Sequence, residues 1–80
     1  MMDKGKQLAD NFVLNARAVR RRKGMQMIEL AKRAGMTARM LESVERGKTR
    51  IKLHDAVNIA NVLETDFMTL LTGCIQDVED

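Results

Sequence analysis

Apolar residues recur along the chain at the three- and four-residue spacing of helices, in five segments separated by glycines or short polar stretches. The first segment carries one apolar stripe, continues into the basic block Arg20–Lys23 and ends at Gly24. Basic residues complement the dipole at the end of a helix, and Gly24 can adopt the left-handed conformation that terminates it. The stripe consists of Leu8, Phe12, Ala16 and Val19.

Two shorter helices are predicted next. One spans about 26–34 and ends at Gly35, and the other begins at the N-cap residue Thr37 and ends at Gly47. Because helices this short are marginal alone, each requires packing against the others. The inward positions are Met27, Leu30, Ala31 and Ala34 in the first, and Leu41 and Val44 in the second.

Residues 48–52 have no apolar period and predict a loop, after which a fourth helix covers about 53–63. Two inward faces are possible for it: Val57, Ala60 and Leu63, or Ala56, Ile59 and Leu63. Asp66 then caps a fifth helix that ends before Gly73 and carries Phe67, Leu70 and Leu71. Since no alternating strand pattern or internal repeat occurs, the fold class is predicted to be all-α.

The length of 80 residues predicts a single domain over 1–80, with a core from 6 to 73 and flexible tails at 1–5 and 74–80. No apolar run reaches the length of a membrane span, and the first residues lack the apolar stretch of a secretion signal, so we expect no membrane association. The single cysteine, Cys74, cannot form an intramolecular disulfide, which favours a reducing, cytoplasmic location.

Charge divides the chain into two parts. Residues 1–52 contain all 14 Lys and Arg against five acids, a balance of +9, whereas 53–80 contain six acids and no basic residue, a balance of −6. Grouped basic residues are typical of a protein that binds a polyanion, because each neutralised phosphate releases counterions. A simple solvated basic face is the alternative, and the clean separation favours nucleic acid as the partner.

The stretch 30–47 has the pattern of a helix, a short turn and a second helix. Ala31 is small enough for two helices to cross closely, and Gly35 can supply the positive φ of a sharp turn. Leu41 and Val44 anchor the second helix from below. This helix therefore exposes its first turn, as a helix in the major groove of DNA must. Its outward residues are Ala38, Arg39, Glu42 and Ser43.

Residues 14–73 resemble the Cro/CI, or XRE-type, helix-turn-helix family, which includes the lambdoid phage repressors. The resemblance implies a five-helix lambda-repressor-like domain with the helix-turn-helix in helices 2 and 3. It further implies a sequence-specific transcriptional regulator without a cofactor, a repressor that binds a pseudo-palindromic operator as a homodimer. The matching positions are Arg17, Arg20, Lys23-Gly24, Glu29-Leu30-Ala31, Gly35, Thr37, Leu41, Val44-Glu45-Arg46-Gly47, Ile59-Ala60 and Leu63.

The sequence departs from the family pattern at two places. Helix 2 usually begins with Ser or Thr followed by Gln, which binds a phosphate, and here these positions are Gln26 and Met27. The amide of Gln26 can substitute, or one backbone contact is missing. The loop before helix 4 contains Arg50-Ile51-Lys52 in place of an Asn-Pro-Ser type segment, so it adds charge.

The resemblance assigns roles to individual side chains. Arg39 occupies a base-reading position, where a guanidinium can bind guanine O6 and N7; phosphate contact alone is the alternative. Arg20 and Glu45 are expected to form a desolvated structural ion pair. Expected to read bases are Ala38, Arg39 and Ser43. Expected to contact phosphates are Gln26, Thr37, Lys48, Thr49 and Arg50. Residues that either flank the groove or only face solvent are Arg17, Arg21, Arg22 and Lys23.

An enzyme is not indicated. His54-Asp55 has no Ser or Cys nucleophile in a recognisable motif, and the acidic tail beside Cys74 disfavours a reactive thiolate. One His and one Cys also provide no metal-ligand spacing.

Helices 4 and 5 contain more apolar residues than two short helices need to bury, so the homodimer is expected to form through them. Two alternatives stay open. The protein can be monomeric until it binds its operator, or it can be an antitoxin or anti-repressor type module that binds DNA mainly with a protein partner.

Overall fold

The computed structural model describes residues 3–77, and these form five helices with no strand among them. The predicted all-α class is confirmed, and residues 48–52 form the predicted loop. The helices are α1 (Lys4–Arg22), α2 (Met27–Arg33), α3 (Ala38–Glu45), α4 (Leu53–Val62) and α5 (Phe67–Thr72).

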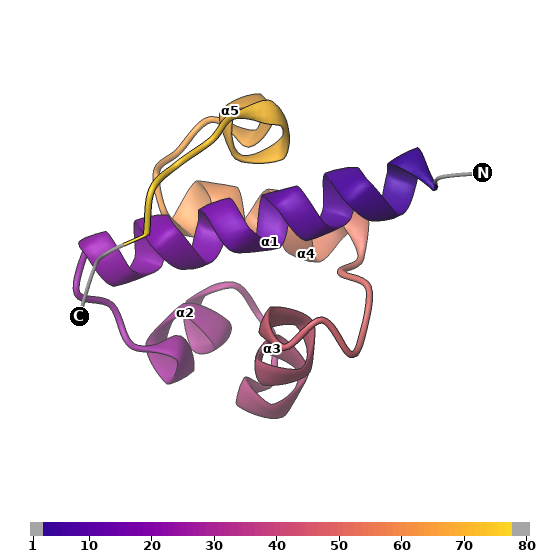
Figure 1. Cartoon of the computed structure of the whole chain (residues 1–80). Helices are drawn as coiled ribbons and strands as arrows, with labels where there is room; N and C mark the ends of the chain where they lie inside the picture. The colour runs from indigo at the N-terminus through magenta and orange to yellow at the C-terminus, as the bar shows by residue number, and fades with distance from the viewer. Residues whose placement is uncertain (1–2, 78–80) are drawn as a thin grey trace.

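The longest helix, α1, crosses the whole molecule, with α2 and α3 on one side of it, α5 on the opposite side and α4 behind (Figure 1). It contributes Phe12 and Ala16 to a core that all five helices share. The ring of Phe12 lies 5.5 Å from that of Phe67, centroid to centroid, which ties α1 to the start of α5. The largest fully buried side chains are Phe12, Leu30, Leu41, Ile59, Leu63 and Leu70.

Two expectations about inward faces are resolved. In α4 the face with Ala56, Ile59 and Leu63 is buried, whereas Val57 is 41% exposed. Leu8, expected in the inward stripe of α1, is 42% exposed. Leu8 instead lines an open surface hollow between this end of α1 and the end of α5, together with Leu71.

The turns on both sides of α2 depend on glycine. Gly24 and Gly35 have φ values of +68° and +76°, a region that residues with a Cβ rarely adopt. After Gly35, the N–H of Met36 donates to the carbonyl of Ala31, which closes the turn between α2 and α3. The sharp turn expected at Gly35 is therefore present.

Two asparagines fix α5 to α1, and neither was singled out in the sequence. Asn15, only 3% exposed, donates from Nδ2 to the carbonyls of Leu70 (2.7 Å) and Gly73 (2.9 Å). Its Oδ1 accepts a hydrogen bond from the N–H of Ile75 at 2.9 Å. Asn11 adds bonds from its own Nδ2 to the carbonyls of Leu71 and Gly73. These amides satisfy carbonyl groups that the end of any helix leaves without a partner.

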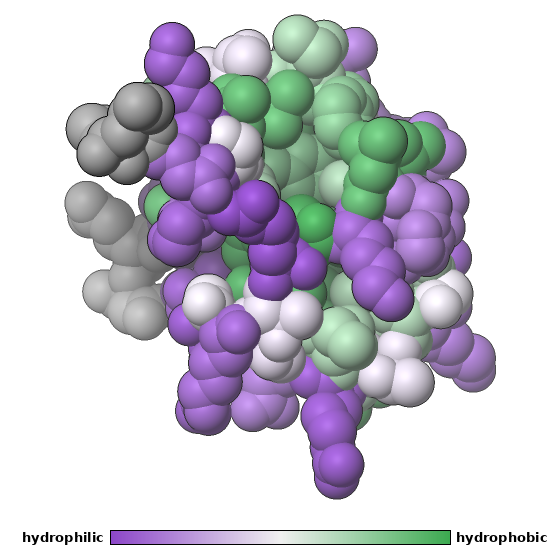
Figure 2. Space-filling view, turned by 90° about the vertical axis from the view of Figure 1, so that its right-hand side faces the viewer, coloured by the Kyte–Doolittle hydropathy of each residue, from purple (hydrophilic) through white to green (hydrophobic). Residues whose placement is uncertain are grey.

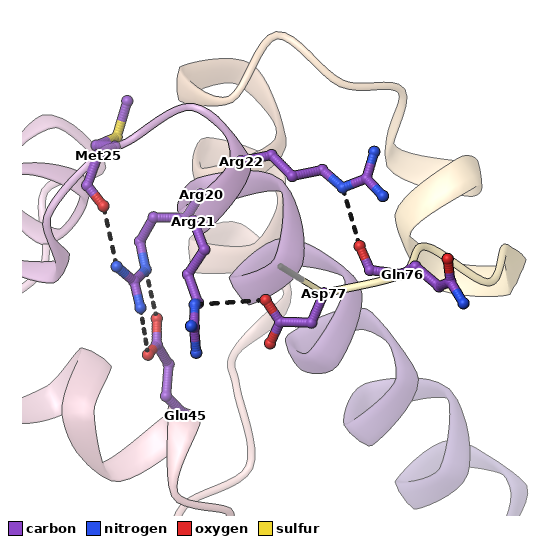
Figure 3. A network of polar contacts seen from close by, with 7 residues as sticks. All are labelled: Arg20, Arg21, Arg22, Met25, Glu45, Gln76 and Asp77. Carbon is purple, nitrogen blue, oxygen red and sulfur yellow. Dashed lines mark hydrogen bonds and ion pairs between the residues drawn. The ribbon is translucent and has the colours of Figure 1, made fainter. Parts of the chain in front are cut away.

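The sequence predicts flexible tails at 1–5 and 74–80, and the structure describes part of each. Asp3 caps α1 by accepting a hydrogen bond from the N–H of Lys6, so the helix begins before the expected core. Residues 74–77 lie along α1 because Asn15 binds Ile75 and two arginines of α1 bind the residues after it (Figure 3). The remainder of both tails, 1–2 and 78–80, lies outside the described residues.

Candidate nucleic-acid interface

Helix α3 is held by its cap and by two buried side chains. The Thr37 hydroxyl accepts a hydrogen bond from the N–H of Met40 at 3.1 Å, as the predicted N-cap requires. Leu41 and Val44 point into the molecule and are 2% and 3% exposed. The opposite face of α3 therefore remains available to a ligand, and Arg39 is exposed on it.

A surface hollow of about 460 Å³ lies between this face of α3 and the start of α2. It brings together all three predicted base-reading residues and one of the predicted phosphate-binding residues. Ile28, which is 64% exposed, and Arg46 also line it, and neither is among the predicted site residues. The full lining is Met27, Ile28, Ala38, Arg39, Glu42, Ser43, Arg46 and Lys48.

The other predicted phosphate-binding residues lie outside this hollow. Gln26 is exposed at the N-cap of α2, and its side chain makes no capping hydrogen bond. The Thr49 hydroxyl lies 2.7 Å from the hydroxyl of Ser43. Arg50 donates from Nη2 to Asp3 Oδ2 at 2.9 Å, so this guanidinium already has an acidic partner 47 residues away in the chain.

The pKa of the Asp3 carboxyl is lowered, first by the hydrogen bond from the Lys6 N–H and then by the Arg50 side chain. Asp3 therefore stays ionised where it joins the start of α1 to the loop before α4. Because the Asp3 and Arg50 side chains are 58% and 54% exposed, water screens the pair and leaves the guanidinium accessible.

One acid, Glu42, lies on the exposed face of α3. It forms an ion pair with Arg46 one turn later, at 3.7 Å. Arg46 thereby offsets a charge that DNA phosphates would otherwise repel.

The ion pair expected between α1 and the end of α3 is present. Arg20 binds both carboxylate oxygens of Glu45 at 3.1 Å and also donates to the Met25 carbonyl at 2.9 Å (Figure 3). The Arg20 and Glu45 side chains are 13% and 14% exposed, so both charges are largely removed from water. A two-point contact fixes both distance and orientation, and it sets the end of α3 against α1.

Two of the arginines for which the sequence leaves two roles possible contact residues 76 and 77. Arg21 pairs with Asp77 at 3.4 Å, and Arg22 donates to the Gln76 carbonyl at 2.9 Å (Figure 3). The sequence predicts only a groove-flanking or solvent-facing role for them. In the structure they hold residues 76 and 77 against α1.

Three further properties concern the described residues alone. Within 3–77 no three His, Cys, Asp or Glu side chains gather closely enough to hold a metal ion. None of the five helices is long and apolar enough to cross a membrane. His54 is 73% exposed and lies 3.2 Å from Asp55, as a surface histidine.

The arrangement of α2 and α3 is thus a helix, a glycine turn and a second helix whose outer face is open. The model of the helix-turn-helix family matches residues 17–70, about two thirds of the chain, and this range contains the whole hollow. The chain belongs to the XRE-type helix-turn-helix family. The all-helical architecture of this helix-turn-helix protein is consistent with the lambda-repressor-like fold of Cro/CI-like members.

Membership establishes the general activity. This helix-turn-helix protein is a DNA-binding transcription regulator, and its family is a regulatory domain that is generally not enzymatic. A search of curated proteins gave no match.

Proposed function

We propose that the protein is a repressor that recognises a pseudo-palindromic operator as a homodimer, with α3 in the major groove. The observation that carries this proposal is the hollow at α3, where Ala38, Arg39 and Ser43 face outward together. The Arg20–Glu45 pair supports the same role, because it holds the end of α3 against the longest helix. A recognition helix needs such rigid support to reach the same base edges in every complex.

The side chains divide into two groups by the DNA atoms that suit them. Arg39 is suited to guanine O6 and N7, Ala38 to a thymine methyl, and Ser43 to one hydrogen bond with a base edge. Around them, hydroxyl, amide and cationic groups at both ends of α3 and at the N-cap of α2 suit phosphate oxygens, and such contacts fix position without reading sequence. The side chains proposed to contact phosphates are Gln26, Thr37, Lys48, Thr49 and Arg50.

Arg39→Ala and Lys48→Ala are expected to weaken DNA binding in different ways. The first should cost about 1–3 kcal/mol on the preferred duplex and relax one position in each half-site. The second should weaken binding to all duplexes alike and reduce the slope of log K against log salt by about 1. Fluorescence anisotropy titrations on the preferred and on a scrambled duplex, at several salt concentrations, measure both effects.

Lys32→Ala is a suitable control, because Lys32 is an exposed cation near the end of α2 and does not line the hollow. It should leave the sequence preference unchanged. If Arg39→Ala also left the preference unchanged, α3 would not read DNA with the proposed face. Specific binding that appeared only after a second protein was added would favour the antitoxin or anti-repressor type of module.

The proposed homodimer uses α4 and α5. Leu53, Val57 and Met68 are 73%, 41% and 56% exposed there. Figure 2 shows the face at the N-terminal end of α1. On this face apolar side chains gather toward α5, and hydrophilic side chains surround them. The molecule measures 37 × 25 × 23 Å. Since successive major grooves on one face of DNA are about 34 Å apart, two bound copies would be close enough to touch.

Sedimentation at low micromolar concentration is expected to give twice the monomer mass. Raised salt should tighten the dimer, because it screens the acids of the C-terminal part, and should loosen the DNA complex. Leu53→Lys should produce monomers, while Ile28→Lys, at a similarly exposed site on α2, should not change the mass. A monomer at both low and high salt would contradict a preformed dimer.

A further inference from the structure

The hydroxyls of Ser43 and Thr49 lie 2.7 Å apart and share one hydrogen bond, in which either can be the donor. Ser43 is on the outer face of α3 and lines the hollow with Arg39 and Lys48, whereas Thr49 is exposed in the loop after α3. The pair therefore connects a proposed base-reading residue directly to a proposed phosphate-binding residue. Among residues 3–77, neither hydroxyl has another hydrogen-bond partner.

Each hydroxyl has one proton to donate and two lone pairs that accept. A DNA phosphate has only acceptor oxygens at neutral pH, so Thr49 can bind it only by donating its own proton. The bond between the two hydroxyls must then run from Ser43 to Thr49. This uses the single proton of Ser43, and only its lone pairs remain for the DNA base.

We propose that the Ser43–Thr49 pair makes Ser43 a hydrogen-bond acceptor on the recognition face, so that Ser43 selects adenine or cytosine at one position of each half-site. The inference rests on the proposed function, in which Thr49 contacts a phosphate. It adds a residue, Thr49, that sets specificity without touching a base.

The selection follows from the edges that bases present in the major groove. Adenine N6 and cytosine N4 are amino groups and donate there, whereas the hydrogen-bonding atoms of guanine and thymine in this groove are all acceptors. A serine alone is indifferent, since its hydroxyl can donate or accept. With its proton committed to Thr49, Ser43 would face guanine or thymine with two acceptor atoms opposed and no proton between them.

The charge around Thr49 favours this direction of the shared bond. Lys48 and Arg50 flank Thr49 in the chain, and all three residues are exposed, so this loop attracts a phosphate. The opposite direction would turn the lone pairs of Thr49 toward the phosphate oxygens and forfeit the contact. Phosphate binding at the loop therefore fixes Ser43 as the donor in its hydrogen bond with Thr49.

The position that Ser43 reads is the one at which Ser43→Ala loses the base preference of the wild type. The test uses four duplexes that differ only at this position. The wild type should bind the duplexes with adenine or cytosine on the contacted strand about tenfold more tightly than those with guanine or thymine. Thr49→Val keeps the shape of the side chain but removes the hydroxyl, which frees Ser43 to donate. Its preference should fall to about twofold, while Thr49→Ser should retain the preference of the wild type.

Thr72→Val, which removes an exposed hydroxyl from α5, is the matched control and should behave as the wild type. Thermal melts of Thr49→Val, Thr49→Ser and Thr72→Val should coincide with that of the wild type, because Thr49 and Thr72 are exposed. A wild type that favours guanine or thymine at this position, or a Thr49→Val variant that keeps the full preference, would overturn the inference and leave the proposed function intact. Equal binding of the wild type to selected and scrambled duplexes would overturn both.

Discussion

Glu45→Ala is expected to lower the free energy of unfolding by about 3–5 kcal/mol, a large part of the stability of a domain this small. The substitution removes both hydrogen bonds between α1 and the end of α3, and it leaves the Arg20 charge in a site where the side chain is 13% exposed. The remaining bond from Arg20 to the Met25 carbonyl cannot neutralise a cation. Thermal unfolding followed by circular dichroism should show a fall in Tm of roughly 12 °C or more.

Glu29→Ala provides a matched control. Glu29 pairs with Arg33 at 3.6 Å on the surface of α2, where the two side chains are 55% and 49% exposed. Loss of an exposed helical pair should cost at most about 0.5 kcal/mol. Replacing Arg20 and Glu45 together by Met and Leu should recover much of the stability, because no uncompensated charge is then buried. A shift of less than about 2 °C in Glu45→Ala would contradict the structural role of this pair.

Asn15→Leu is expected to cost about 2–4 kcal/mol, although leucine has the same number of side-chain heavy atoms as asparagine and better suits an apolar site. Asn15 uses its two donors and its acceptor on Leu70, Gly73 and Ile75. Without it, the Leu70 carbonyl and the Ile75 N–H lose these partners at a position that is 3% exposed, while Asn11 still binds Gly73. Chemical denaturation and amide hydrogen exchange of α5 measure the loss.

The expected loss is local as well as global. Exchange should accelerate first at α5 and at Ile75, because α5 has only six residues and depends on these contacts. Asn58→Leu is the control, since Asn58 is exposed and makes one long bond of 3.4 Å to the Ala34 carbonyl. Equal stability of the two variants would show that the amide of Asn15 does not hold α5.

The helices and the helix-turn-helix were predictable because their signals are local. Apolar periodicity, the caps at Thr37 and Asp66 and the turn at Gly35 each act within a few residues, and all are present. The resemblance to the family supplied the Arg20–Glu45 pair, whose partners are 25 residues apart. The roles of single side chains on DNA stay predictions.

Contacts between distant segments were missed because the chemistry of each residue does not identify its partner. Asn15 lies in a stretch that also contains exposed polar residues, and its partners are 55 to 60 residues away. The one available signal is that Asn11 and Asn15 are four residues apart, beside the buried positions Phe12 and Ala16. The ion pair between Arg50 and Asp3 likewise has no signal in the sequence.

Selection of DNA from a random pool by the purified chain alone tests the central claim, that α3 reads bases as part of a symmetric pair. Two copies of α3 on one duplex should enrich one motif with two inverted half-sites whose centres are about 10–10.5 base pairs apart, one turn of DNA. Arg39→Ala should enrich the same motif with one position relaxed in each half. Recovery of DNA with no common motif by the wild type, in salt low enough for binding, would show that α3 does not read bases.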